Sequence, residues 1–206
     1  MSSRAFSADR HRASVGAVLA GGMSSRMGAP KATLELAGRP LVGYPLEAVA
    51  AAGLVPVVVA KGGSELPDLQ CRVVRDSHAR SHPAAGIVAA LAAADGPVVV
   101  VACDMPFVPA QLLMVLAQLD SRLAVPMLGG RTQPLLARYE PGVVAALERA
   151  VERGEPLSEA VAALDPLVLG PDELAGFGDP GWIAFNINDR DDLATAEQLV
   201  APAPSR

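Results

Sequence analysis

Residues 15–31 read VGAVLAGGMSSRMGAPK, in which a short apolar run leads directly into a glycine-rich loop. The compact run Val15–Ala20 predicts a buried β-strand. Glycines allow a backbone to approach an anion closely and to turn several N–H groups toward it. Arg26 and Lys31 add positive charge to the loop. This stretch therefore predicts a strand whose carboxyl end carries a phosphate-binding loop.

The glycine spacing in this loop excludes two common phosphate-binding motifs. A dinucleotide fingerprint needs G-x-G-x-x-G, which Gly21-Gly22 followed by Gly28 does not provide. A P-loop needs four residues between its glycines and a lysine directly after the second glycine. Here Lys31 comes three positions after Gly28. An ordinary surface loop with incidental charges is the alternative that composition leaves open.

Outward from this stretch, short apolar runs alternate with helical patterns. We expect further strands at Val55–Ala60, Arg72–Arg75, Val98–Cys103, Ala124–Met127, Pro134–Tyr139 and Phe185–Ile187. We expect helices at Leu41–Ala52, Pro83–Ala94, Pro109–Leu119, Gly142–Arg153, Ser158–Leu164 and Asp189–Val200. Gly129-Gly130 is a turn signal between two of the strands, which we expect to pair. This order predicts an α/β protein with a mostly parallel, Rossmann-like sheet in a three-layer α/β/α arrangement. The predicted single domain covers residues 15–200, between flexible tails at residues 1–14 and 201–206.

Composition narrows the classes of partner. The chain has 206 residues, a net charge of -5 and only 3% aromatic residues, which argues against a nucleic-acid-binding protein. Two cysteines are too few for a disulfide framework. We recognise neither a secretory signal nor a membrane-spanning stretch and therefore expect a cytoplasmic protein with no membrane partner. Lysine is rare: the chain has only Lys31 and Lys61, and we interpret the second, beside Gly62-Gly63, as an ordinary surface residue.

Two carboxylates follow predicted strands, Asp76 and Asp104. Ligands of open α/β sheets bind outside the carboxyl ends of the strands, so we expect both to lie near the glycine-rich loop. Asp104 is a candidate ligand of Mg²⁺, which one or two carboxylates and substrate phosphates typically hold. The alternative for Asp104 is a turn-initiating role, and the alternative for Asp76 is a surface ion pair with Arg75 or Arg80.

Asn186 and Asn188 also belong to the candidate site. They alternate on the expected strand Phe185–Ile187 and its end, so their side chains would share one face. A role in capping the last helix is the alternative.

Residues 19–31, LAGGMSSRMGAPK, resemble the signature L-A-G-G-x-S-x-R-M-G-x-x-K of nucleotidyltransferases related to the molybdenum cofactor guanylyltransferases. Four more segments are similar to motifs of that family: GRPL at 38–41, CDMPF at 103–107, QPL at 133–135 and NIN at 186–188. The resemblance covers about residues 15–195 and implies the nucleotide-diphospho-sugar transferase type of sheet. Two places depart from the pattern. His82 replaces the glycine of G-P-L-A-G, and Ala60-Lys61 stands after the second strand, where some relatives have asparagine.

The resemblance implies an enzyme that transfers GMP from GTP to molybdopterin or its molybdenum form, releases pyrophosphate and uses Mg²⁺. The implied catalytic residues are Lys31, Arg26 and Asp104, with Asp104 as the metal ligand. The implied acceptor-binding residues are Asn186 and Asn188. The implied nucleotide-binding residues are Leu19, Ala20, Gly21, Gly22, Lys31, Asp76, Gly86 and Asp104. Proteins of cofactor synthesis or molybdoenzyme chaperones are expected partners.

Other functions stay open at this level. Cytidylyl-transferring relatives usually have L-A-A-G, so Gly22 favours guanine. Other small phosphorylated acceptors and a non-catalytic nucleotide-binding module are the remaining alternatives. The glycine spacing disfavours an NAD-dependent dehydrogenase.

Overall fold

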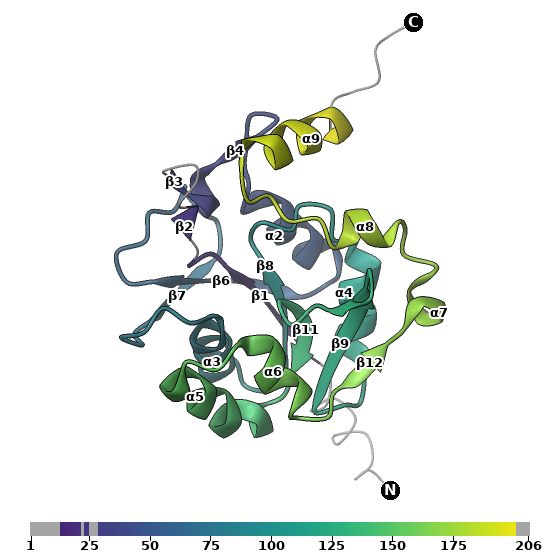
Figure 1. Cartoon of the computed structure of the whole chain (residues 1–206). Coiled ribbons are helices and arrows are strands. Elements are labelled where there is room, and N and C mark those ends of the chain that lie inside the picture. Colours follow the sequence, from purple (N-terminus) through teal and green to yellow (C-terminus); the bar gives the residue numbers. More distant parts are fainter. Residues whose placement is uncertain (1–12, 22, 25–28, 201–206) are drawn as a thin grey trace, which may run out of the picture.

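The computed structural model describes residues 13–21, 23–24 and 29–200, which form one central sheet covered by helices (Figure 1). The order of the main strands is β10-β9-β11-β8-β1-β6-β7, and β12 pairs with β9. Their bounds are β1 Val15–Leu19, β6 Val55–Lys61, β7 Arg72–Asp76, β8 Val98–Ala102, β9 Leu123–Leu128, β10 Arg131–Thr132, β11 Leu136–Tyr139 and β12 Leu167–Leu169. Strands β8, β1, β6 and β7 are mutually parallel, whereas β11 runs antiparallel to β8 and β9. The mostly parallel sheet predicted from the sequence is confirmed.

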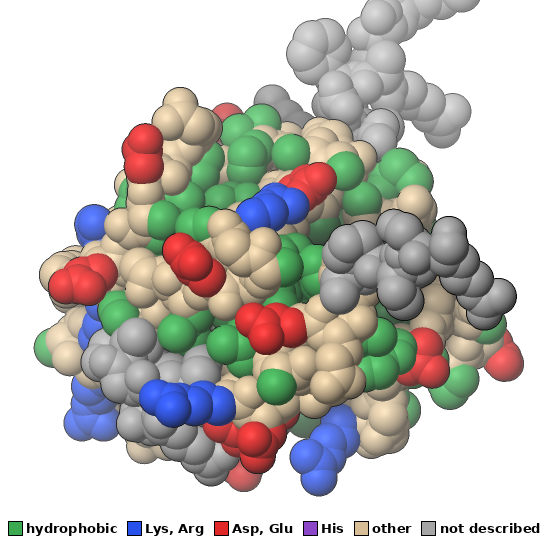
Figure 2. Space-filling model, turned by 90° about the horizontal axis from the view of Figure 1, so that it is seen from above, with side chains coloured by type: hydrophobic (Ala, Val, Ile, Leu, Met, Phe, Trp, Pro, Cys, Tyr) green, Lys and Arg blue, Asp and Glu red, His purple; other side chains and the backbone are tan. Residues whose placement is uncertain are grey.

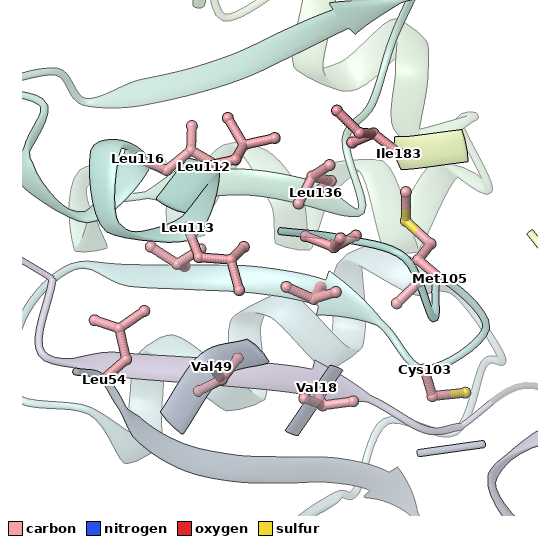
Figure 3. Close-up of a cluster of buried hydrophobic side chains, with 14 of the residues drawn as sticks. Val18, Val49, Leu54, Cys103, Met105, Leu112, Leu113, Leu116, Leu136 and Ile183 are labelled. Atoms are coloured by element: carbon pink, nitrogen blue, oxygen red, sulfur yellow. The ribbon is translucent and has the colours of Figure 1, made fainter. Parts of the chain in front are cut away.

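Helices cover both faces of the sheet. One buried cluster joins the sheet to α2 (Gly43–Ala51) and α4 (Ala110–Gln118) through side chains such as Val49 and Leu112 (Figure 3). A second cluster, on the opposite face, includes α3 (Pro83–Ala93), α5 (Val144–Arg153) and α6 (Leu157–Ala162). From Val98 to Val101, successive β8 residues enter the two clusters alternately, as the two-residue period of a strand requires. The three layers are therefore those expected from the alternating pattern.

Strand β1 is the centre of the parallel part, with β6 on one side and β8 on the other. The chain passes from β1 to β6 and β7, and then crosses back to β8. Such a reversal creates a crevice at the carboxyl ends of the strands, where α/β proteins bind ligands. Gly16 allows α2 to pack closely on β1, because a Cβ there would lie 2.4 Å from Val49 Cγ1. Packing thus fixes the strand from which the glycine-rich loop departs.

The expected pairing of the strands on either side of Gly129-Gly130 is confirmed, since β11 pairs with β9. The turn joins β9 to the short β10, and β11 pairs with both β9 and β8. A smaller ladder joins β4 (Glu35–Leu36) to β5 (Arg39–Pro40), and another joins β2 (Met23–Ser24) to β3 (Ala29–Pro30). These two-residue strands and β12 were not predicted from the sequence.

The region after β12 differs most from expectation. Two short helices follow it, α7 (Pro171–Leu174) and α8 (Pro180–Ile183), and the last helix is α9 (Arg190–Val200). The strand expected at Phe185–Ile187 is absent from this described segment, which is irregular. The Asn186 side chain donates to Ala184 O, a local bond that competes with strand pairing.

Two further expectations fall partly or wholly outside the described residues. Most of the predicted N-terminal tail and all of residues 201–206 lie outside them, as do Gly22 and Arg26 of the glycine-rich loop. Among the described helices, none has the length and hydropathy needed to cross a membrane.

Candidate active site

Lys31 is the centre of a polar cluster built from three distant parts of the chain. Its Nζ atom donates to Asp104 Oδ2 at 2.5 Å and to Asn188 Oδ1 at 2.8 Å. Lys31 begins the short 3₁₀ helix Lys31–Thr33, Asp104 follows β8, and Asn188 precedes α9. The side chains of Lys31 and Asp104 are only 14% and 15% exposed, so solvent screens their attraction less than that of a surface pair. An ammonium group carries three N–H donors. Among described residues Lys31 uses two, which leaves the third for a ligand.

The backbone around Asp104 is held on two sides. Cys103 N–H donates to Leu19 O at 3.1 Å, and Ile187 N–H donates to Asp104 O at 3.0 Å. The strand before it, β8, is buried along its whole length. Burial also raises the pKa of the Cys103 thiol, which keeps this neighbour neutral. The Asp104 carboxylate is therefore presented from a rigid, otherwise uncharged strand end.

The two asparagines have different positions from those predicted. Asn188 contacts Lys31 directly, and its Nδ2 donates to Asn186 O at 3.2 Å. The Asn186 amide instead donates to Ala184 O at 2.7 Å. The prediction that both side chains share one strand face is wrong, because no strand forms there. Neither asparagine has the capping role weighed as the alternative: the Asp189 carboxylate accepts from the N–H groups of Asp191 and Asp192 at the start of α9.

A pocket of about 250 Å³, which we call the strand-end pocket, opens beside this cluster. Its walls are the carboxyl ends of β1, β6, β7 and β8, the start of α3, and Lys31. Of the residues predicted to bind a nucleotide, it brings together Leu19, Gly21, Lys31, Asp76, Gly86 and Asp104. Ala20 does not line this pocket, and its N–H already donates to Val59 O at 2.8 Å. The contact between Ala20 and a nucleotide stays a prediction, and atoms of Ala20 other than its N–H would have to make it.

Asp76 ends β7 and is only 7% exposed. Its Oδ1 accepts from His78 N–H at 2.8 Å. It forms no ion pair with Arg75 or Arg80, and Arg75 donates instead to the backbone oxygens of Lys61 and Ser64. The carboxylate is therefore held toward the pocket by a local turn, and the ion-pair alternative does not describe it.

Lys61 lines the pocket, although its sequence suggested an ordinary surface residue. Its Nζ donates to His78 O and Arg80 O, each at 2.8 Å. These bonds join the end of β6 to the loop between Asp76 and His82, which forms one pocket wall. A lysine next to two glycines looks like a surface residue, but its register opposite Asp76 places it at the sheet edge where ligands bind.

His82, which replaces a glycine of the resembled pattern, is occupied by structural bonds. Its Nδ1 accepts from Ala84 N–H at 3.1 Å and so caps the start of α3. Its Nε2 lies 2.8 Å from Glu155 O, which assigns the proton to Nε2. Gly86, one turn later, is close to β1, since a Cβ there would lie 3.4 Å from Leu19 Cδ2.

The donor set limits how a divalent metal would be held. Within the described part of the chain, no three His, Cys, Asp or Glu side chains gather as a metal cage. Mg²⁺ often binds through one or two carboxylates, with substrate phosphates and water completing its shell. Asp104, with acceptor sites beyond the one that Lys31 occupies, fits that arrangement.

Known proteins resemble this chain over most of its length. The family model described as "MobA-like NTP transferase domain" matches residues 16–167. A Pelotomaculum thermopropionicum protein named "Probable molybdenum cofactor guanylyltransferase" is 35% identical, with 89% of this chain and 92% of the relative covered. The molybdenum cofactor guanylyltransferase of Rhizobium johnstonii is 33% identical, with 94% and 95% covered.

A solved structure extends the agreement to three dimensions. The crystal structure of molybdopterin-guanine dinucleotide biosynthesis protein A from Archaeoglobus fulgidus matches with a TM-score of 0.76 and 29% identity. The match covers 89% of this chain and 97% of that one. Both the sequence and the fold thus agree over nearly the whole length, and the chain belongs to the MobA-like NTP transferase family.

Proposed function

We propose that this protein is a molybdenum cofactor guanylyltransferase, which transfers GMP from GTP to molybdopterin or its molybdenum form and releases pyrophosphate. The observation that carries the proposal is Lys31, held between Asp104 and Asn188 at the mouth of the strand-end pocket. Relatives that cover nearly the whole chain bear the name of this activity. A compact ammonium group suits phosphate oxygens that approach from several directions.

The reaction needs little proton transfer. A phosphate monoester has its second pKa near 6, so the terminal phosphate of the acceptor is mostly a dianion at pH 7. One of its oxygens attacks the α-phosphorus of GTP and forms a new P–O bond. The bond from that phosphorus to the oxygen bridging the α- and β-phosphates breaks, and pyrophosphate leaves with the electron pair. The work of the protein is then to position two polyanions and to stabilise the charge that develops.

Each polar residue has a distinct part in this proposal. The strand-end pocket binds the nucleotide, with Lys31 donating to phosphate oxygens and Asp104 fixing the position of Lys31. Asn188, a predicted acceptor-binding residue, accepts the second hydrogen bond of Lys31. Bound Mg²⁺, with Asp104 as its protein ligand, supplies neutralisation of phosphate charge. Arg26, outside the described residues, stays a predicted assistant of Lys31.

Ligand-induced thermal stabilisation tests the nucleotide choice. GTP with Mg²⁺ is expected to raise the melting temperature more than CTP, UTP or NAD, because a ligand at 100 times its Kd adds about 2.7 kcal/mol. Each ligand is measured with and without Mg²⁺, and pyrophosphate release is then assayed with GTP and molybdopterin. Stabilisation by CTP alone contradicts guanylyl transfer, and stabilisation by NAD alone contradicts nucleotidyl transfer.

Lys61→Met is expected to raise the KM for GTP about tenfold, the equivalent of one charge-assisted hydrogen bond. The substitution keeps the aliphatic stem and removes both bonds to the loop carbonyls, so the pocket wall loses its anchor. We expect kcat to change less than about twofold, since Lys61 makes no bond to Lys31 or Asp104.

Arg72→Met is the matched control for Lys61→Met. Arg72 also donates to a backbone carbonyl, Ala93 O at 3.1 Å, but it does not line the strand-end pocket. Its removal is expected to leave the KM for GTP unchanged. An unchanged KM in Lys61→Met would refute the role of Lys61 in shaping the pocket.

A further inference from the structure

Three of the chain's seven aromatic residues gather in one place, which we call the aromatic cluster: Phe107, Trp182 and Phe185. The Phe107 and Trp182 rings meet edge to face, with centroids 6.0 Å apart and an interplanar angle of 81°. Phe185 lies 5.4 Å from Trp182 and 6.0 Å from Phe107. Each ring is therefore positioned by the other two, at separations typical of stable aromatic pairs.

The aromatic cluster comes from the two segments that carry the reactive residues. Phe107 is three residues after Asp104, and Phe185 directly precedes Asn186. The bond from Ile187 N–H to Asp104 O joins these segments, and Met105 and Ile183 enter the same buried cluster beneath them (Figure 3). The backbone at Trp182 is fixed as well, since its N–H donates to Asp179 Oδ1 at 3.1 Å. The three rings thus belong to two segments that a backbone hydrogen bond joins at Asp104.

Trp182 is the exposed member of the aromatic cluster. It is 38% exposed, while Phe107 and Phe185 are half-buried against it. Figure 2, viewed toward the end of the molecule that carries β4 and α9, shows hydrophobic side chains exposed between charged ones. Aromatic side chains that gather beside a few polar groups are a common lining of ligand-binding sites.

The strand-end pocket has no comparable aromatic ring. Among the described residues that line it, none is Phe, Tyr or Trp. The aromatic cluster is linked to the reactive centre through Asn188, which contacts Lys31 and lies three residues after Phe185. None of the three rings lines the pocket, so a second substrate at the aromatic cluster would not compete with the nucleotide for the same residues.

We propose that the aromatic cluster binds the planar fused heterocycle of the acceptor, which stacks on Trp182 while the acceptor phosphate lies at Lys31. This inference rests on the proposed function, in which the acceptor carries a pterin. Heteroaromatic rings stack on tryptophan faces irrespective of their exact substituents. The indole N–H adds one donor at the rim of the surface. The aromatic cluster thus supplies affinity for the part of the acceptor that takes no part in the chemistry.

Fluorescence tests the proposal without relying on turnover. Trp182 is the chain's sole tryptophan, so its emission reports on this site alone. Titration with anaerobically prepared molybdopterin is expected to quench the emission saturably. GTP alone, bound in the other pocket, is expected to leave most of it unchanged. Emission that is unaffected at molybdopterin concentrations saturating pyrophosphate release would overturn the proposal.

Kinetics of two variants give the second readout. Trp182→Ala is expected to raise the KM for molybdopterin at least about fivefold, the lower range for losing one stacking contact. The KM for GTP is expected to change less than about twofold, and Trp182→Phe to retain most of the acceptor affinity. An unchanged KM for molybdopterin, or an equal rise in both KM values, would contradict acceptor binding by the aromatic cluster.

Leu167→Ala is the matched control for surface exposure. Leu167 is 46% exposed on β12 and pairs with Ala124 near the amino end of β9, away from the strand ends that carry the site. It is expected to leave both KM values unchanged. If the wild-type protein binds GTP but forms no pyrophosphate with molybdopterin, the proposed function fails; the molybdopterin titration of Trp182 emission then decides separately about the aromatic cluster.

Discussion

Asp104→Asn is expected to lower the rate of pyrophosphate release about 10²-fold, the order of magnitude of removing one preorganised electrostatic group. Asparagine has almost the same shape as aspartate but lacks its charge. The change removes the carboxylate charge that holds Lys31 Nζ at 2.5 Å. Both the position of Lys31 and the affinity for Mg²⁺ depend on it. Steady-state rates measured over a range of Mg²⁺ concentrations check the prediction.

The stability of Asp104→Asn separates chemistry from folding. Removing one partner of this mostly buried pair is expected to lower the free energy of unfolding by about 1–3 kcal/mol, between the values for exposed and fully buried pairs. Glu47→Gln is the control, because it breaks the exposed Arg39–Glu47 pair at 2.8 Å. That variant is expected to keep its rate and its stability. A nearly normal rate in a folded Asp104→Asn protein would remove Asp104 from the mechanism.

Local pattern was sufficient to predict the layers of the fold. The β-branched run Val98–Cys103 contains the fully buried strand β8, and helix α3 begins at Pro83 as expected. The rule that ligands bind at strand ends also placed Asp76 and Asp104 near Lys31, and both line one pocket with it. These features follow from periodicity and chain order, which any sequence displays directly.

Two kinds of feature were not predictable in this way: pairing between strands far apart in the chain, and local side-chain hydrogen bonds that replace regular structure. Strand β11 pairs with β8 as well as with β9, and its pairing with β8 depends on strands that are far apart in the chain. The segment Phe185–Ile187 has an apolar–polar–apolar pattern, but the Asn186 side chain bonds to the preceding backbone and no strand forms. The role of Lys61 was equally unpredictable, because it depends on hydrogen bonds to two loop carbonyls that no sequence motif specifies.

Lys31→Met is expected to lower kcat at least tenfold, and Lys31→Arg is expected not to restore it. Methionine retains most of the stem but has no charge to stabilise the departing pyrophosphate. Arginine keeps the charge, but its planar fork does not fit a position where one atom lies 2.5 Å from Asp104 Oδ2 and 2.8 Å from Asn188 Oδ1. Rates of pyrophosphate release and melting temperatures of both variants are the measurements.

The double variant Lys31→Met with Asp104→Asn tests whether the two residues act as a unit. Groups that act together are strongly non-additive, since losing one already disables the other. We therefore expect the double variant to lose about as much rate as the more impaired single variant. A loss equal to the product of the two single losses would mean that Lys31 and Asp104 contribute independently. In that case the contact between Lys31 and Asp104 would be a feature of the ligand-free site, and Asp104 would act on the phosphates without positioning Lys31.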